Sequence, residues 1–319
     1  MAIPALEGEL RPELRAELVR ALRRLPELGE GELTFTALSG GITNRNFLVG
    51  GSPGGSRFVV RLAGNDTHLL GISREVEHAA TVIAAGVGVG PEVVAYLRRE
   101  GFLVTRFIEG RPIPQREMRE PERLRAVGAT LRRIHDGPAI PGLFVPFRIV
   151  EAYRALARSR GVSIPPDYEL AQAIARRIEL ACLNAPVELR PCHNDLLNAN
   201  FIDDGRRIRI VDWEYAGMGD PFFDLGNFSI NHELDADQDA LLLGAYLDEG
   251  LEARRALAAR LTLMRVLSDF REAMWGVLQQ GISTLEVDFR AYAAEHFERL
   301  LAAAAQPAFE RALIEAANG

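Results

Sequence analysis

Cysteine is scarce in this chain of 319 residues, which contains only Cys182 and Cys192. Two cysteines do not build the disulfide framework of a small secreted protein, so we expect a reducing, cytoplasmic location. Long apolar runs are also missing. No stretch approaches the ~20 residues that cross a bilayer, and the N-terminus lacks the basic-then-apolar pattern of a signal peptide. The sequence therefore predicts neither secretion nor membrane insertion.

The sequence also lacks a basic stripe. Its 37 basic and 44 acidic residues give a formal net charge of -7, and the two signs are interspersed along the chain. Bulk electrostatics therefore argue against a nucleic-acid partner and favour a small molecule. The hydrophobic content of 48% and the charged content of 25% are ordinary for a globular protein. The length allows one large domain or two lobes.

The first part of the chain predicts a small α+β unit. Leucines at helical spacing predict one amphipathic helix from Arg11 to Leu28. A second helix is expected from Ser73 to Ala85. Short segments rich in β-branched and aromatic residues predict about five antiparallel strands, with that helix after the third, at residues 34–39, 44–50, 57–63, 92–97 and 102–108.

Helical patterns dominate after Gly110, where glycine and proline cluster and where we expect the junction between two lobes. One β-like island interrupts them, "RPCHNDLLNANFIDDGRRIRIVDWE", residues 190–214. The "DDG" within it predicts a hairpin turn. The second part of the chain is therefore expected to be mostly helical, with one small β element.

Three short polar side chains of this island, Asp195, Asn200 and Asp212, are expected to lie close together, because the hairpin brings their loops to one end. Hard oxygen ligands of this kind suit Mg²⁺ bound with substrate phosphates, and a carboxylate not needed for the metal can accept the proton of an attacking hydroxyl. The alternative is that Asp and Asn only form turns. The complete set between two strands favours the metal site.

Cys192 and His193 do not predict a thiol nucleophile and its base, because neighbouring strand residues point to opposite faces. Cys192 is expected to be a buried structural cysteine. We expect His193 to orient the loop through a hydrogen bond. Zinc is not expected, since the six histidines are scattered and neither cysteine has CxxC spacing.

Two features of the first part of the chain are suited to phosphates. In "LSGGITNRNFLV", Gly40 and Gly41 separate two strands, where backbone N–H groups can approach a phosphate, although a hairpin turn without a ligand also explains them. Arg61 ends the third strand, and Glu77, with Glu75 as its competitor, lies on the next helix. Protein kinases hold nucleotide phosphates with such a pair. The alternative is two separate exposed residues.

Near the C-terminus, "SDFREAMWGVLQQ" places Asp269, Glu272, Trp275 and Gln279 at steps of three to four residues. Such residues share one helical face, which is suited to an ammonium group through charge and cation–π contact. The alternative is a helix whose polar side faces solvent while its apolar side packs inward. The sequence leaves both open.

Together, "LSGGITNRNFLV", "VVRLAG", "ISREVEHAA", "LVTRFIEG", "HNDLLNANF", "RIVDWEYAGMGDPFFDLGNF" and "MWGVLQQGIS" resemble the choline/ethanolamine kinase family, within the wider aminoglycoside phosphotransferase and protein-kinase-like superfamily. The order and spacing match from about Thr36 to Leu300, most closely with bacterial choline kinase-like proteins. The resemblance implies a bilobal α+β fold. Residues 1–109 would form a nucleotide-binding lobe with an antiparallel sheet, and residues 110–319 a larger, mostly helical catalytic and substrate-binding lobe.

The resemblance also implies roles for individual residues. Asp195 corresponds to the catalytic base, in a loop that contains His193 and that Asp224 braces, and Asn200 and Asp212 correspond to the Mg²⁺ ligands. The residues implied for ATP are Gly40, Gly41, Thr43, Asn44, Arg61 and Glu77, with Thr105 and Phe107 of the hinge "VTRFIEG". Those implied for the acceptor are Glu214, Tyr215, Asp269, Glu272 and Trp275, where Tyr215 and Trp275 match aromatic positions around an ammonium.

The activity implied is transfer of the γ-phosphoryl group of ATP to the hydroxyl of an amino alcohol such as choline or ethanolamine. An aminoglycoside, thiamine or another small metabolite is the alternative acceptor. A catalytically silent nucleotide-binding protein is a further alternative, but such proteins usually lack a base or a metal ligand, and none is missing here. The short segment between "DWE" and "DLGN" favours a small acceptor over a protein.

Overall fold

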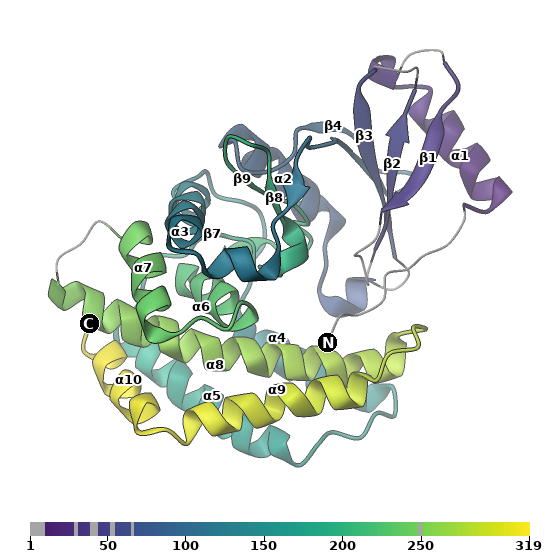
Figure 1. The fold of residues 1–319 in the computed structure, drawn as a ribbon. Coiled ribbons are helices and arrows are strands. Elements are labelled where there is room, and N and C mark those ends of the chain that lie inside the picture. Colours follow the sequence, from purple (N-terminus) through teal and green to yellow (C-terminus); the bar gives the residue numbers. More distant parts are fainter. Residues whose placement is uncertain (1–9, 29–30, 39–43, 52–54, 65–66, 248–250) are drawn as a thin grey trace.

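The computed structural model describes residues 10–28, 31–38, 44–51, 55–64, 67–247 and 251–319. Figure 1 shows a small sheet-containing part, in purple and blue, set on a larger helical body in teal, green and yellow. None of the described helices is at once long and apolar enough to cross a membrane. The mixed α+β architecture with a small sheet and a large helical part is the one predicted.

The smaller part is a five-stranded antiparallel sheet in the order β1-β2-β3-β5-β4. Helix α2 (Arg74–Gly86) follows the third strand, as predicted. Alternate strand residues face one side of the sheet, where Phe47, Phe58 and Val60 are buried in one hydrophobic cluster with leucines of α1. The strands are β1 (Thr34–Leu38), β2 (Asn44–Gly50), β3 (Arg57–Ala63), β4 (Val93–Leu97) and β5 (Phe102–Arg106).

Helix α1 (Pro12–Leu22) is shorter than the helix predicted to end at Leu28, so that prediction was wrong at its C-terminal end. Pro26 starts a separate 3-10 turn, η1 (Pro26–Leu28). Proline lacks the N–H that the helix needs and disfavours helical geometry in the residue before it.

The larger part is mostly helical, as predicted. Figure 1 shows α8 and α9 lying side by side along the base of this part, with α6 and α7 above α8. Every residue of α8 from Val266 to Gln279 is buried. The helices are α3 (Pro121–His135), α4 (Pro146–Ser159), α5 (Asp167–Asn184), α6 (Pro221–Asn231), α7 (Ala236–Tyr246), α8 (Leu251–Ile282), α9 (Phe289–Ala304) and α10 (Pro307–Ala317). Short 3-10 turns are η2 (Thr67–Leu70), η3 (Gln115–Arg119) and η4 (Asn198–Asn200).

Short strands in the larger part bring two loops together. The predicted hairpin is confirmed, because β8 (Phe201–Asp203) pairs antiparallel with β9 (Ile208–Ile210), and β8 also pairs with β6 (Arg111–Pro112). Strand β7 (Arg190–Cys192) pairs with β10 (Gly217–Gly219). These pairings set the loop after β7 beside the loop after β9.

Two hydrophobic clusters form the core. One belongs to the sheet and α1, and the other fills the helical part. Apolar residues of α2 and its flanks, including Leu70, Ala80 and Val89, belong to the second cluster. Helix α2 therefore packs its apolar face with the helical part, and the predicted boundary near Gly110 stays a prediction.

Candidate active site

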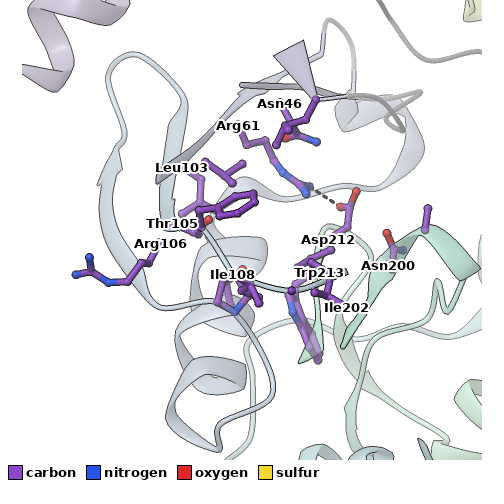
Figure 2. Close-up of a pocket in the computed structure, with 18 of the residues that line it drawn as sticks. Asn46, Arg61, Leu103, Thr105, Arg106, Ile108, Asn200, Ile202, Asp212 and Trp213 are labelled. Carbon is purple, nitrogen blue, oxygen red and sulfur yellow. Dashed lines mark hydrogen bonds and ion pairs between the residues drawn. The ribbon is translucent and has the colours of Figure 1, made fainter. Parts of the chain in front are cut away.

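A cleft of about 350 Å³ lies between the sheet and the β8–β9 hairpin, within the size range of small-molecule sites. In Figure 2, Thr105 and Ile108 approach it from β5 and the segment after it, and Ile202 and Trp213 approach from β8 and the segment after β9. Apolar side chains, including Val59 and Leu103, line most of the wall, which suits a flat organic ring. Charged groups gather at one end.

Arg61 and Glu77 form the ion pair predicted for this end of the cleft, with Arg61 Nη1 3.0 Å from Glu77 Oε1. The same nitrogen donates a hydrogen bond to a carboxylate oxygen of Asp212 (Figure 2). Glu75 is exposed and pairs with Arg98 instead. The geometry thus selects Glu77 over Glu75 as the partner of Arg61.

Asp212 has the backbone φ of 68°, which is rare for a residue with a side chain. Strain of this kind persists where the surrounding structure fixes it, often at functional sites. Burial alone would raise the pKa of Asp212, but the charge and hydrogen bond of Arg61 outweigh burial and lower it. This carboxylate therefore stays ionised.

Asn200 links the two loops. Its amide nitrogen donates to the backbone oxygen of Asp195 at 2.8 Å. In Figure 2 its amide oxygen points toward Asp212. Asn200 therefore connects the backbone of Asp195 to the end of the cleft where Asp212 lies, and the joint role of the three residues stays a prediction.

The backbone of the loop after β7 is held from α6. Asp224 accepts hydrogen bonds from the backbone N–H groups of His193 at 2.8 Å and Asn194 at 2.6 Å. Asn227, one turn later, accepts from the N–H of Leu196 at 2.6 Å. Asp224 thus has the bracing contacts that the sequence led us to expect.

His193 joins this loop to the segment that carries Asp212. Its Nε2 lies 3.0 Å from the backbone oxygen of Val211, and its Nδ1 accepts the N–H of Asp195 at 3.2 Å. Its ring also packs against Trp213 edge to face. Because both ring nitrogens are used, His193 orients the loop and is not available as a base.

The side chain of Asp195 is held by Arg271 of α8, whose Nη2 lies 3.0 Å from Asp195 Oδ1. Among the described residues, Oδ2 of Asp195 has no hydrogen-bond partner. Burial raises the pKa of Asp195 to about 6 against the opposing charge of Arg271, and the nearby charge of Glu272 also raises it. A partly buried carboxylate with this proton affinity is suited to accept a proton near neutral pH.

Asp269 is not free for an acceptor, which corrects its predicted role. Its carboxylate pairs with His296 at 2.9 Å and accepts two hydrogen bonds from Arg299 Nε at 2.8 and 2.9 Å. Both partners lie on α9, so Asp269 joins two helices. The solvent-facing alternative is also wrong, because Asp269, Glu272, Trp275 and Gln279 are all buried.

Trp275 and Tyr215 do not contact each other among the ring pairs of the described residues. Trp275 packs edge to face against Phe289 and Tyr292, with ring centroids 5.8 and 5.7 Å away. The guanidinium of Arg271 lies 5.5 Å from the ring centroid of Tyr215. The chain's own cation therefore already contacts one of the two predicted aromatic positions.

Glu214 connects the larger part to the sheet. Its Oε2 accepts a hydrogen bond from Asn44 Nδ2 at 2.7 Å and lies 3.4 Å from Arg74 Nη1. Arg74 also pairs with Glu77 at 2.6 Å. These contacts join the predicted nucleotide residues Asn44 and Glu77 to the predicted acceptor residue Glu214, whose roles stay predictions.

The structure describes only some of the residues predicted to bind the nucleotide. Gly40, Gly41 and Thr43 lie outside the described residues. Thr105 and Phe107 line the cleft, but the N–H of Phe107 donates to Arg57 O at 2.9 Å. Ile108 also lines the cleft, and its N–H has no hydrogen-bond partner among the described residues, so it is one hinge donor available to a base.

His135, Cys192 and Asp224 offer ligand atoms within 4.8 Å of one another, although the scattered histidines of the sequence argued against a zinc site. Each atom already has a partner: His135 Nε2 lies 3.0 Å from Asp224 Oδ2, and Cys192 Sγ donates to Arg190 O. Burial raises the pKa of the Cys192 thiol well above its usual value. Cys192 is therefore the buried structural cysteine that we predicted.

Arg271 and Arg74 are the residues near this site that the sequence did not reveal. Arg271 contacts Asp195, which precedes it by 76 positions, and Arg74 contacts Glu214, which follows it by 140. Neither pair has a local pattern. The one signal is that "DFREAMW" places three charged residues, Asp269, Arg271 and Glu272, inside an otherwise apolar helical run.

Known proteins resemble this chain in sequence. Residues 34–260 match the model of the phosphotransferase enzyme family. The chain is 28% identical over 224 residues to protein LicA of Haemophilus influenzae, an alignment that covers 70% of this chain and 65% of LicA. It is 28% identical over 267 residues to ethanolamine kinase 2 of Rattus norvegicus, covering 76% of this chain and 68% of that kinase.

A crystal structure of a choline/ethanolamine kinase family protein from Mesorhizobium loti superposes on this chain with a TM-score of 0.82 at 31% identity. The match covers 96% of this chain and 99% of that one, so both lobes are shared. The predicted protein-kinase-like fold is confirmed. The chain belongs to the phosphotransferase enzyme family and, within it, to the choline/ethanolamine kinase family.

Proposed function

We propose that this protein transfers the γ-phosphoryl group of ATP to the hydroxyl of a small amino alcohol, with ethanolamine and choline as the first candidates. The observation that carries the proposal is that Asn200 and Asp212 line the charged end of the cleft, and that Asn200 is hydrogen-bonded to the backbone of Asp195. Positioning and electrostatic stabilisation supply most of the catalysis in phosphoryl transfer, and these residues are arranged for both.

The cleft supports nucleotide binding. A base fits between the apolar side chains that line it, with the N–H of Ile108 as donor. Arg61 faces the charged end, where a guanidinium paired with Glu77 can hold phosphate oxygens. In this proposal the phosphates lie beside Asp212.

The donor set fits Mg²⁺. A carboxylate that stays ionised and an amide oxygen that points toward it are hard ligands, and Mg²⁺ prefers such oxygens together with phosphates. We assign Asp212 and Asn200 as these ligands. Bound there, Mg²⁺ neutralises charge on the phosphates.

Asp195 is the proposed base. Its Oδ1 is held by Arg271, and its Oδ2 has no partner among the described residues. A hydroxyl that donates to Oδ2 would be oriented by the same loop that Asp224 and Asn227 fix. The base therefore needs little reorganisation when the acceptor binds.

A cationic acceptor is supported by the charges near Asp195. The charges of the buried carboxylates Glu272 and Glu214 both raise the pKa of Tyr153, and the hydroxyl of Tyr215 has no hydrogen-bond partner among the described residues. The names of the relatives, choline/ethanolamine kinase and ethanolamine kinase, support the same class. Asp269 is not part of the proposed acceptor site, because its carboxylate is paired with His296 and Arg299.

Other acceptors of the same superfamily, an aminoglycoside or thiamine, are the second candidate, because the fold alone does not set the acceptor. A silent nucleotide-binding protein is disfavoured by the complete catalytic set. We also propose a cytoplasmic location, because the chain has only two cysteines and a reducing compartment suits it.

The test is ADP release with ATP and Mg²⁺ across ethanolamine, choline, thiamine and an aminoglycoside. Asp195→Asn keeps the shape of the side chain and removes the base. Asp237→Asn, at an exposed position of α7, is the matched control. We expect acceptor-dependent turnover in the wild type and the control, and a loss of about 10²–10⁴-fold in Asp195→Asn.

The acceptor that gives the highest kcat/KM identifies the substrate class. Preference for an aminoglycoside or thiamine would overturn the amino-alcohol assignment but keep the kinase. If no acceptor raises ADP release above the rate of Asp195→Asn, the protein does not phosphorylate any of these four acceptors and the proposed function is wrong. Nucleotide binding without turnover would then support a catalytically silent protein.

A further inference from the structure

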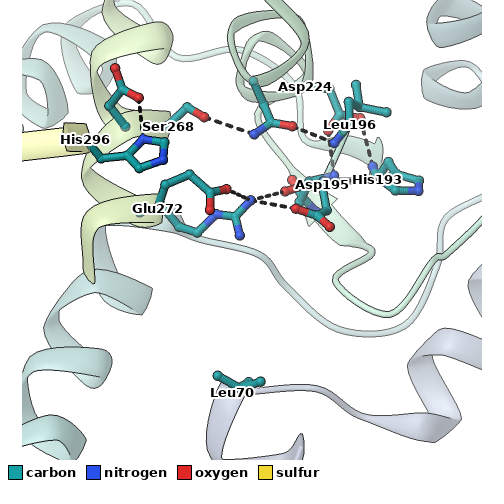
Figure 3. Close-up of polar contacts among 12 residues, drawn as sticks. Leu70, His193, Asp195, Leu196, Asp224, Ser268, Glu272 and His296 are labelled. Atoms are coloured by element: carbon teal, nitrogen blue, oxygen red, sulfur yellow. Dashed lines mark hydrogen bonds and ion pairs between the residues drawn. The ribbon is translucent and has the colours of Figure 1, made fainter. Parts of the chain in front are cut away.

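Arg271 is buried, with 2% of its side chain exposed, at the point where α8 meets the loop after β7. Its Nη2 lies 3.0 Å from both Asp195 Oδ1 and the backbone oxygen of Asn194, and 2.7 Å from Glu272 Oε1. Figure 3 shows these contacts running from Glu272 to the Asp195 loop. One guanidinium group thus joins a helix carboxylate to the proposed base.

Burying a guanidinium is unfavourable by several kcal/mol unless good partners compensate. Here the partners are two carboxylates, so the cluster keeps one net negative charge. Glu272 is fixed in turn, because its Oε2 accepts a hydrogen bond from Tyr292 at 2.8 Å. A residue needed only for packing at this place would be apolar, since that avoids the desolvation cost.

Attachment of the loop to α8 does not require Arg271. Asn227 accepts the N–H of Leu196 and donates to Ser268 Oγ of α8 at 3.0 Å (Figure 3). Asp224 fixes the backbone of His193 and Asn194. With the backbone already held, the distinct contribution of Arg271 is to the side chain of Asp195.

The contact determines which oxygen of Asp195 is available. Oδ1 accepts from Arg271, and no described residue donates to Oδ2. Without the guanidinium, the carboxylate can rotate about its last bond and lose the orientation toward a hydroxyl. Misplacement of a reacting group by about 1 Å costs about 10²-fold in rate.

We propose that Arg271 is a positioning residue that fixes the carboxylate of Asp195 for the acceptor hydroxyl, with Glu272 as the buried counter-charge that holds the guanidinium in place. This inference rests on the proposed phosphoryl transfer. It adds a functional role for α8, 76 residues after the base, that concerns the acceptor step and leaves the nucleotide site unchanged.

The kinetic test compares Arg271→Met and Arg271→Lys with Arg260→Met. Arg260 is a buried arginine of the same helix, paired with Asp220 and with the backbone oxygen of Ala185. We expect kcat to fall about 10²-fold in Arg271→Met, with the KM for ATP within twofold of the wild type. Arg271→Lys keeps the positive charge, so its kcat should lie between those of the wild type and Arg271→Met.

The control separates positioning from stability. Arg260→Met is expected to lower Tm and to leave kcat within twofold. Equal losses of kcat in Arg260→Met and Arg271→Met, or a Lys variant no faster than Met, would overturn the proposal. If Arg271→Met does not fold, Arg271→Gln replaces it in the same comparison with Lys.

A second measurement does not depend on turnover. A double-mutant cycle of Arg271→Lys and Asp195→Asn on thermal unfolding should show that the two losses of Tm are not additive, as expected for residues in contact. Additive losses would overturn the proposal even if no acceptor is found. Wild-type inactivity with every acceptor, together with a coupled cycle, would instead count against the proposed function alone.

Discussion

Two arginines, the partly buried Arg61 and the buried Arg271, lie on the two sides of the proposed reaction centre, and each bridges two carboxylates. On the nucleotide side, Arg61 of β3 pairs with Glu77 of α2 and with Asp212. On the acceptor side, Arg271 of α8 pairs with Glu272 and Asp195. The composition is the same: one cation, one carboxylate from a helix and one from a loop.

The proton affinities of the two loop carboxylates nevertheless differ in direction. Burial opposes ionisation at both, but Arg61 outweighs it at Asp212, whose pKa is lowered, while the pKa of Asp195 is raised to about 6. Hydrogen bonding to Arg61 and the further cation Arg74 favour the anion at Asp212. One carboxylate is thus suited to hold a metal and the other to accept a proton.

The largest expected effect comes from breaking the nucleotide side with Asp212→Asn. Removing the charged ligand should lower kcat/KM by about 10³-fold, because a bound metal supplies several kcal/mol of charge stabilisation. It should also abolish the strengthening of ATP binding by Mg²⁺ in a titration. Asp195→Asn is expected to keep that strengthening, and its loss there would show that the two carboxylates do not have separate roles.

A smaller effect is expected for Arg61→Met. Hydrogen bonds to charged groups contribute about 1.5–3 kcal/mol, so the KM for ATP should rise about 10- to 100-fold. The KM for the acceptor is expected to stay within threefold. Steady-state kinetics with each substrate varied in turn give both KM values. The matched variant is Arg271→Met, in which we expect the KM for ATP to stay close to that of the wild type.

The pH dependence should separate the two carboxylates. Because the proposed base works as the anion and its pKa is raised to about 6, turnover is present above that pH and lost as the pH falls through it, about tenfold at pH 5. ATP binding measured by titration should persist at pH 5, since the pKa of Asp212 is lowered. Parallel loss of binding and turnover would contradict this separation.

The smallest effects come from the two candidate partners of Arg61. Glu77→Gln removes a buried charge and should raise the KM for ATP about fivefold, as expected for a loss of about 1 kcal/mol. Glu75→Gln is the control, because an exposed ion pair contributes little. Its KM should stay within twofold, and equal effects of the two substitutions would reject Glu77 as the specific partner.

Local patterns predicted much of this molecule. Alternating β-branched residues located β2 and β3, and the step from strand to helix predicted the pair Arg61–Glu77. The "DDG" turn predicted the hairpin that sets Asp212 beside the loop of Asp195. Each of these depends on neighbours within a short stretch of chain.

The remaining features depend on packing between distant segments. Helical spacing grouped Asp269 with Glu272, but Asp269 pairs with Arg299, which becomes clear only once α9 lies along α8. Glu272 pairs instead with Arg271 of its own helix. The end of α1 is a different case, because Pro26 is a local signal that the leucine spacing does not take into account. Roles at Gly40 and Gly41 rest on the family resemblance.

The cation that lies against Tyr215 affects which ligands this enzyme can bind tightly. Because Arg271 is covalently part of the chain, it acts as a tethered competitor for that ring face, at an effective concentration that a free ligand does not easily match. A quaternary ammonium inhibitor therefore loses part of the ring contact that it would gain in an open aromatic cage. A primary amine depends less on that ring contact, because it also donates hydrogen bonds, so we expect it to lose less affinity here than a trimethylammonium group.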